Sequence, residues 1–143
     1  MDYAFQYVES SPLMLEDAYP YTARQGYTCQ YVSSKGLGKV KSFKDVSRDT
    51  SGQQLQAALA KGPVSVAVEA DQFAFQGYTS GVITSGCGTQ LDHGVLAVGY
   101  GTLDGSDYFL IKNSWGASWG DQGYLRIAPD QCGVTLQPSY TSS

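Results

Sequence analysis

Four strand-like runs in the second half of the chain constrain its fold most strongly. They are V-S-V-A-V (64 to 68), G-V-L-A-V-G-Y (94 to 100), D-Y-F-L-I-K-N (107 to 113) and G-Y-L-R-I (123 to 127). The dipeptide Asp104-Gly105, which is typical of tight hairpin turns, separates the second run from the third. Closely spaced strands joined by short turns favour an antiparallel sheet, which can curl into a barrel. We therefore predict an α+β fold with helix early and sheet late.

The first half of the chain carries helix and turn signals. Residues 51 to 63 combine Ser51 as a candidate N-cap, Gln54 three positions later and Gly62 before a proline, which predicts a helix. Met1 to Val8 has apolar residues at helical spacing and no N-cap, so it is interpreted as the second half of a helix. Ser10 to Gly38 is rich in turns and tyrosines, and we expect an extended segment that buries these rings.

Composition excludes several classes of function. The 143 residues are 42% hydrophobic and 15% charged, which indicates one globular domain. The net charge of −4, without a run of lysine or arginine, argues against nucleic-acid and anionic-membrane partners. No apolar stretch approaches the roughly 20 residues of a membrane span, and no secretory signal pattern is present.

The chain contains a single histidine, His93, and a single asparagine, Asn113. His93 opens one predicted strand and Asn113 closes the next, so a hairpin would bring both side chains to one end of the sheet. An asparagine oxygen that accepts from one imidazole nitrogen fixes the tautomer and leaves the other nitrogen to face a nucleophile. The pairing alone favours the other interpretation, a partly buried histidine that is satisfied by its neighbours.

The segments around these residues resemble a known family. L-D-H-G-V-L-A-V-G-Y-G and I-K-N-S-W-G-A-S-W-G-D-Q-G-Y are similar to the histidine and asparagine blocks of papain-like cysteine proteases, in particular their cathepsin L-like members. M-D-Y-A-F-Q-Y-V, Y-P-Y and G-P-V-S-V-A-V extend the resemblance over nearly the whole chain. It implies a partial papain-like domain: residues 1–40 as a remnant of the helical (left) half, and 41–143 mainly as the antiparallel β-barrel (right) half.

The resemblance implies roles for individual residues. His93 matches the catalytic imidazole and Asn113 the amide that orients it. Trp115 matches the indole that covers the bond between them, and Trp119 a second ring on the leaving-group side. Asp92 either tunes the catalytic ion pair electrostatically or ends the strand as an exposed carboxylate.

The resemblance also implies a substrate pocket and a disulfide. The residues that match the pocket for the second substrate side chain upstream of the cut are Met1, Ala67, Leu91, Gly94 and Gln137. Such a pocket would prefer a hydrophobic side chain and tolerate a polar end. The three cysteines are an odd number without C-x-x-C spacing, so zinc is improbable, and spacing alone leaves open one bridge or none. In the family, Cys87 and Cys132 match a bonded pair, and Cys29 matches a cysteine with an upstream partner.

The nucleophile of the family has no counterpart in the sequence. Papain-like enzymes carry it in C-G-[SA]-C-[WY], which would fall roughly 40 residues before Met1. None of the three cysteines begins a predicted helix that would lower its pKa, so we expect the chain alone to be inactive. His93 also lacks companions for a metal site, and no cofactor is implied.

Two classes of function remain. The first is a cysteine-type endopeptidase from which the segment with the catalytic cysteine is missing, in a lysosomal, vacuolar or extracellular setting. The alternative is a non-catalytic papain-fold binding or scaffold module within a larger assembly. In both, the apolar face of Met1–Val8 should be covered by the missing N-terminal third or by another protein. A polypeptide substrate is expected only in the first.

Overall fold

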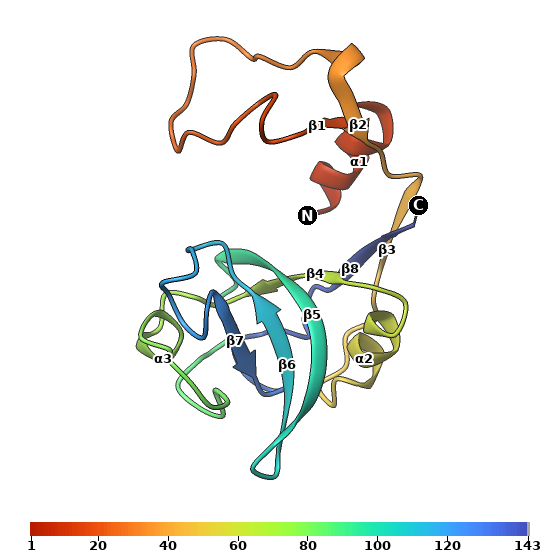
Figure 1. Cartoon of the computed structure of the whole chain (residues 1–143). Helices are drawn as coiled ribbons and strands as arrows, with labels where there is room; N and C mark the ends of the chain where they lie inside the picture. The colour runs from red at the N-terminus through yellow and green to blue at the C-terminus, as the bar shows by residue number, and fades with distance from the viewer. Residues whose placement is uncertain (143) are drawn as a thin grey trace. The chain divides into compact units, whose positions relative to one another are not determined.

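The structure, a computed structural model, describes residues 1–142 and contains two compact units (Figure 1). Unit 1 comprises Met1–Lys44 together with Thr141 and Ser142, and unit 2 comprises Asp45–Tyr140. The boundary between the units falls within two strands, β3 (Ser42–Asp45) and β8 (Ser139–Ser142). Each unit is therefore described by itself.

Unit 2 is built on an antiparallel sheet, as the sequence predicts. Its central strands are β4 (Val64–Val68), β5 (His93–Leu103), β6 (Ser106–Lys112) and β7 (Tyr124–Ile127). The strand order is β3-β8-β4-β5-β6-β7, and β5 and β6 form a long curved hairpin (Figure 1). Asp104 and Gly105 at its tip have φ of 50° and 80°, the left-handed conformations that a tight hairpin turn requires. The predicted strands and turn are confirmed.

The core of unit 2 follows from the alternation of side chains along the strands. Residues two apart point to the same face of a sheet, so Val64, Val66 and Val68 all turn inward and are fully buried. Two helices, α2 (Gln53–Leu59) and α3 (Phe73–Gln76), contribute Leu55 and Phe75 to the same core. The fully buried aromatic and aliphatic side chains of β6 and β7 are Phe109, Ile111, Leu125 and Ile127.

The start of α2 differs from the prediction. Ser51 is not the N-cap, because the helix begins at Gln53 after Gly52, whose φ is 79°. The carboxylate of Asp49 accepts hydrogen bonds from the backbone N–H groups of Ser51 (2.9 Å) and Gln54 (3.2 Å). The Ser51 hydroxyl also donates to Asp49, and these bonds together lower the pKa of the Asp49 carboxyl. The Ser51 hydroxyl accepts the Gln53 N–H at 3.4 Å, so the Asp49 carboxylate and this hydroxyl together bind the first N–H groups of α2.

Unit 1 contains little regular structure. It has a helix, α1 (Asp2–Ser10), a one-turn 3-10 helix, η1 (Ser33–Lys35), and a small antiparallel sheet of β1 (Leu13–Met14) and β2 (Gly36–Gly38). The predicted N-terminal helix is confirmed, but the expectation that the tyrosines of residues 10–38 bury their rings is wrong. Tyr21 is 83% exposed and Tyr27 is fully exposed. Among residues 1–44 only Val8 is buried, so the tyrosines have no core of this unit to enter.

Candidate active site

Strand pairing brings His93 and Asn113 to the same end of the sheet. His93 is the first residue of β5 and pairs with Val68 of β4. Asn113 directly follows Lys112, the last residue of β6, which pairs with Leu96 of β5. In an antiparallel hairpin the first strand begins where the second strand ends. The two side chains are therefore neighbours although 20 residues separate them.

The contact between the two side chains determines which nitrogen of the neutral imidazole carries the proton. His93 Nε2 lies 2.8 Å from Asn113 Oδ1, and the Ser114 backbone N–H donates to the same oxygen at 2.8 Å. An amide oxygen only accepts hydrogen bonds, so Nε2 carries the proton and Nδ1 is the basic nitrogen. In the part of the chain that the structure describes, Nδ1 has no hydrogen-bond partner. The pair therefore presents a proton acceptor at a fixed orientation.

An aromatic cluster surrounds this pair. The Trp115 ring lies 5.2 Å from the His93 ring at an interplanar angle of 30°. Phe75, which is fully buried, contacts Trp115 edge-on at 5.4 Å, Trp119 at 5.6 Å and His93 at 6.2 Å. Sequence reasoning missed Phe75, because the F-A-F of residues 73–75 carries no spacing that links it to His93. Its neighbour Phe73 is 89% exposed, so residue type alone could not distinguish the two.

Asp92 has a structural contact that neither interpretation of the sequence included. Its Oδ1 accepts the Ala70 backbone N–H at 2.8 Å, and its own N–H donates to the Val68 carbonyl at 3.0 Å. The exposed carboxylate thus ties the end of β4 to the start of β5, directly before His93.

Four of the predicted pocket residues lie in unit 2. Ala67 pairs with Gly94 across β4 and β5, and a Cβ at Gly94 would meet nothing within 4 Å, so the space beside Ala67 is open. Leu91 is half-buried and packs close to Gly133, where a Cβ would lie 2.5 Å from Leu91 Cδ2. Gln137 is exposed. The fifth residue, Met1, belongs to unit 1 and is 40% exposed.

The cysteines divide into a bonded pair and a free thiol. Cys87 and Cys132 form a disulfide, as the family resemblance implies. The buried carboxylate of Glu69 accepts the backbone N–H of Gly88, next to this bridge, and the sequence analysis did not identify it. Cys29 is an exposed free thiol in unit 1.

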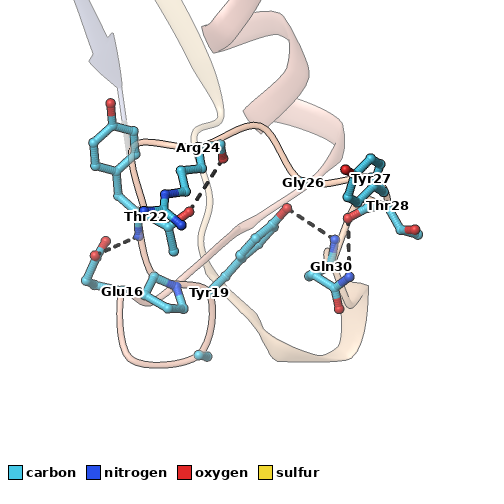
Figure 2. A pocket seen from close by; sticks show the side chains of 11 residues that line it. Glu16, Tyr19, Thr22, Arg24, Gly26, Tyr27, Thr28 and Gln30 are labelled. Atoms are coloured by element: carbon cyan, nitrogen blue, oxygen red, sulfur yellow. Dashed lines mark hydrogen bonds between the residues drawn. The ribbon is translucent and has the colours of Figure 1, made fainter.

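Unit 1 contains a hollow of about 860 Å³, in the loop of residues 16–30 (Figure 2). The Glu16 carboxylate accepts the Tyr21 backbone N–H at 2.9 Å, and the Tyr19 hydroxyl accepts the Gln30 N–H at 3.1 Å. These bonds hold the loop in its own shape, and none of its residues was predicted to act in catalysis. None of the helices in residues 1–142 is long and apolar enough to span a membrane.

Comparisons with known proteins identify the family of the chain. Residues 1–142 match the family described as papain family cysteine protease. Cysteine proteinase RD21A of Arabidopsis thaliana is 43% identical over 98% of this chain, and cysteine proteinase EP-B 1 of Hordeum vulgare is 45% identical over 98%. The chain spans 32% and 40% of the length of these two relatives.

Solved structures show the same fold. A cysteine protease of Carica candamarcensis, solved in complex with E-64, has a TM-score of 0.86 at 40% identity. It is matched over 99% of this chain and 67% of its own length. Digestive procathepsin L 3 of Tenebrio molitor has a TM-score of 0.89 at 38% identity, over 100% of this chain and 48% of its own. From the family match, the fold and the relatives together, the chain belongs to the papain family of cysteine proteases.

Proposed function

We propose that this chain provides the histidine and asparagine of a cysteine-type endopeptidase whose nucleophilic thiol comes from outside these 143 residues. The observation that carries the proposal is the 2.8 Å contact between His93 Nε2 and Asn113 Oδ1, which leaves Nδ1 basic and unpaired among the described residues. The family membership supports the reaction class. The chain alone does not hydrolyse peptides.

The cysteines of the chain do not fit the role of nucleophile. Cys87 and Cys132 are consumed in the disulfide. Cys29 is exposed, belongs to unit 1 and lies outside any helix, which is not the setting of an activated catalytic thiol. A thiol supplied to the free side of the imidazole is therefore required.

The mechanism follows from the geometry of the pair. The incoming thiol transfers its proton to Nδ1 of His93, which forms a thiolate and an imidazolium. The thiolate attacks the peptide carbonyl, and the imidazolium returns the proton from Nδ1 to the leaving amine. Nδ1 then takes a proton from water, which attacks the acyl-enzyme and releases the acid and the thiol. Throughout, Asn113 Oδ1 holds Nε2–H, and Trp115 shields that bond from water.

The substrate is a polypeptide with an apolar side chain at the second position upstream of the cut. The half-buried Ala67 and Leu91 and the open space at Gly94 support this preference. We assign the exposed Gln137 to the base of this proposed pocket. The disulfide favours an oxidising compartment, in line with a lysosomal, vacuolar or extracellular setting.

The test is complementation. The chain is joined to the N-terminal third of a family relative that supplies the thiol, and hydrolysis of a fluorogenic peptide with leucine at the second upstream position is measured. We expect turnover in the joined protein, none in the 143-residue chain, and loss of turnover in His93→Ala. The control Arg48→Gln, at an exposed position of unit 2, should keep full activity.

Three results would refute parts of the proposal. Turnover in the joined His93→Ala protein would remove His93 from the reaction. A joined wild-type protein that folds but is inactive would favour the binding or scaffold role instead. Activity of the unjoined chain would contradict the requirement for an external thiol.

A further inference from the structure

We propose that Arg126 is a positioning residue, which clamps the loop of residues 114–124 and so keeps Asn113 and Trp115 in place around the His93 imidazole. The inference rests on the proposed function, because it assigns a role in the same site. Arg126 lies on β7, outside the residues that the family resemblance identified.

The guanidinium of Arg126 joins three parts of unit 2. Its Nη1 donates to Asp121 Oδ2 at 3.1 Å and to the Tyr78 hydroxyl at 3.5 Å. The guanidinium carbon lies 5.7 Å from the centre of the Tyr108 ring on β6. Tyr78 donates its own proton to the Gly81 carbonyl at 2.7 Å, so its oxygen remains an acceptor for the arginine. The Tyr78 and Asp121 bonds both raise the pKa of Arg126, so the clamp stays charged.

The turn that Arg126 holds also carries the backbone of Asn113. Asp121 and Tyr124 exchange backbone hydrogen bonds of 2.9 and 3.0 Å, which close a tight turn. Within that turn the Gly123 carbonyl accepts the Asn113 N–H at 3.0 Å, and the Gly123 N–H donates to the Trp119 carbonyl at 2.8 Å. A shift of the turn would therefore move the residue that orients the imidazole.

The second partner of Arg126 leads to the tryptophans. Tyr78 lies 6.2 Å from the Trp119 ring, and the Trp119 indole N–H donates to the Gln76 carbonyl at 2.9 Å. Trp119 in turn meets the Trp115 ring edge-on at 5.1 Å. Arg126 is thus linked by two series of contacts to the surroundings of His93. One runs through Asp121 to the Asn113 backbone, and the other runs through Tyr78 and Trp119 to Trp115.

The loop of residues 114–124 needs a side chain that holds it in place, because its glycines leave the backbone conformationally free. Gly116, Gly120 and Gly123 all have positive φ, where glycine has many accessible conformations. Both hydrogen bonds come from Nη1, and the planar guanidinium can make them while its face lies on the Tyr108 ring. Lysine at this position would keep the charge and lose that geometry.

The test uses the 143-residue chain and nitrogen-15 NMR. His93 is the only histidine, so both ring nitrogens are assigned without ambiguity. In the wild type the ring should be almost entirely the Nε2–H tautomer, with slow exchange of that proton. In Arg126→Gln we expect exchange at least tenfold faster and a measurable share of the Nδ1–H tautomer. Arg126→Lys should fall between the two.

The controls separate positioning from stability and from charge. Arg48→Gln makes the same change at an exposed arginine that forms no ion pair within residues 1–142, and it should behave as the wild type. Asp121→Asn removes the ion-pair partner at a half-exposed site and should accelerate exchange in the same direction if Arg126→Gln fails to fold. Exchange within twofold of wild type in a folded Arg126→Gln chain, or in Asp121→Asn, would overturn the proposal.

The readout does not depend on turnover, so the two proposals fail separately. If the joined protein is inactive but Arg126→Gln accelerates exchange, the positioning role stands and the peptidase role falls. In an active joined protein, Arg126→Gln should lower kcat about tenfold and leave KM within twofold, because the substrate pocket is untouched. If Arg126→Gln instead lowers kcat and raises KM by the same factor, the defect is a general structural one, and this result would contradict the positioning role.

Discussion

Replacing Phe75 by leucine should reveal what the aromatic cluster contributes beyond buried volume. Phe75 is fully buried and makes ring contacts with Trp115, Trp119 and His93. The matched control is Phe109→Leu, since Phe109 is also fully buried but pairs with no other ring among residues 1–142. Both variants make the same chemical change in the core of unit 2.

The expected magnitudes follow from the contacts. Exchanging a buried ring for a smaller apolar side chain removes some buried carbon, so Phe109→Leu should lower the free energy of unfolding by about 1 kcal/mol. Each aromatic pair adds about 0.5 to 1.5 kcal/mol, and Phe75 loses two pairs with tryptophan. We expect about 2 to 4 kcal/mol for Phe75→Leu, which separates the urea midpoints of the two variants by roughly 1 M.

The assay is urea unfolding followed by tryptophan fluorescence, with near-ultraviolet circular dichroism of the folded state. Both tryptophans lie in unit 2, so the signal reports on that unit. Phe75→Leu should also change the tryptophan bands in the folded state, whereas Phe109→Leu should not. Equal midpoint shifts, together with unchanged bands in Phe75→Leu, would show that the ring contacts contribute nothing beyond volume.

Two further predictions concern the stability of unit 2. The pKa of Asp49 is lowered in the folded state by hydrogen bonds from the Ser51 hydroxyl, the Ser51 N–H and the Gln54 N–H. The ionised carboxylate therefore stabilises the folded state above about pH 4, and this stabilisation is lost as the pH falls through the folded-state pKa. Urea unfolding of wild type and Asp49→Asn should therefore differ at pH 7 and converge near the acid limit; a constant difference would contradict the assignment. Replacing both Cys87 and Cys132 by serine removes a disulfide that joins residues 45 positions apart, and it should lower the free energy of unfolding by up to about 4 kcal/mol. The same urea assay measures this loss against the oxidised wild type. An unchanged urea midpoint would contradict the prediction.

The sequence by itself determined the sheet and the meeting of His93 with Asn113. Strand alternation and the Asp104-Gly105 turn are local signals, and an antiparallel hairpin converts them into a definite juxtaposition of two distant residues. Family resemblance added the disulfide partners, which spacing alone had left open.

Only the tertiary structure decided which side chains support the pair. Phe75 contacts Trp115, and Arg126 contacts Tyr78, across elements that are far apart in the chain, so no period or spacing identifies these two residues. The same holds for burial: the tyrosines of unit 1 looked like core residues, but a ring is buried only when other segments surround it. The contribution of Asp49 to the start of α2 likewise depends on the position of its carboxylate in space, because hydrogen bonds depend on distance and direction rather than on sequence order.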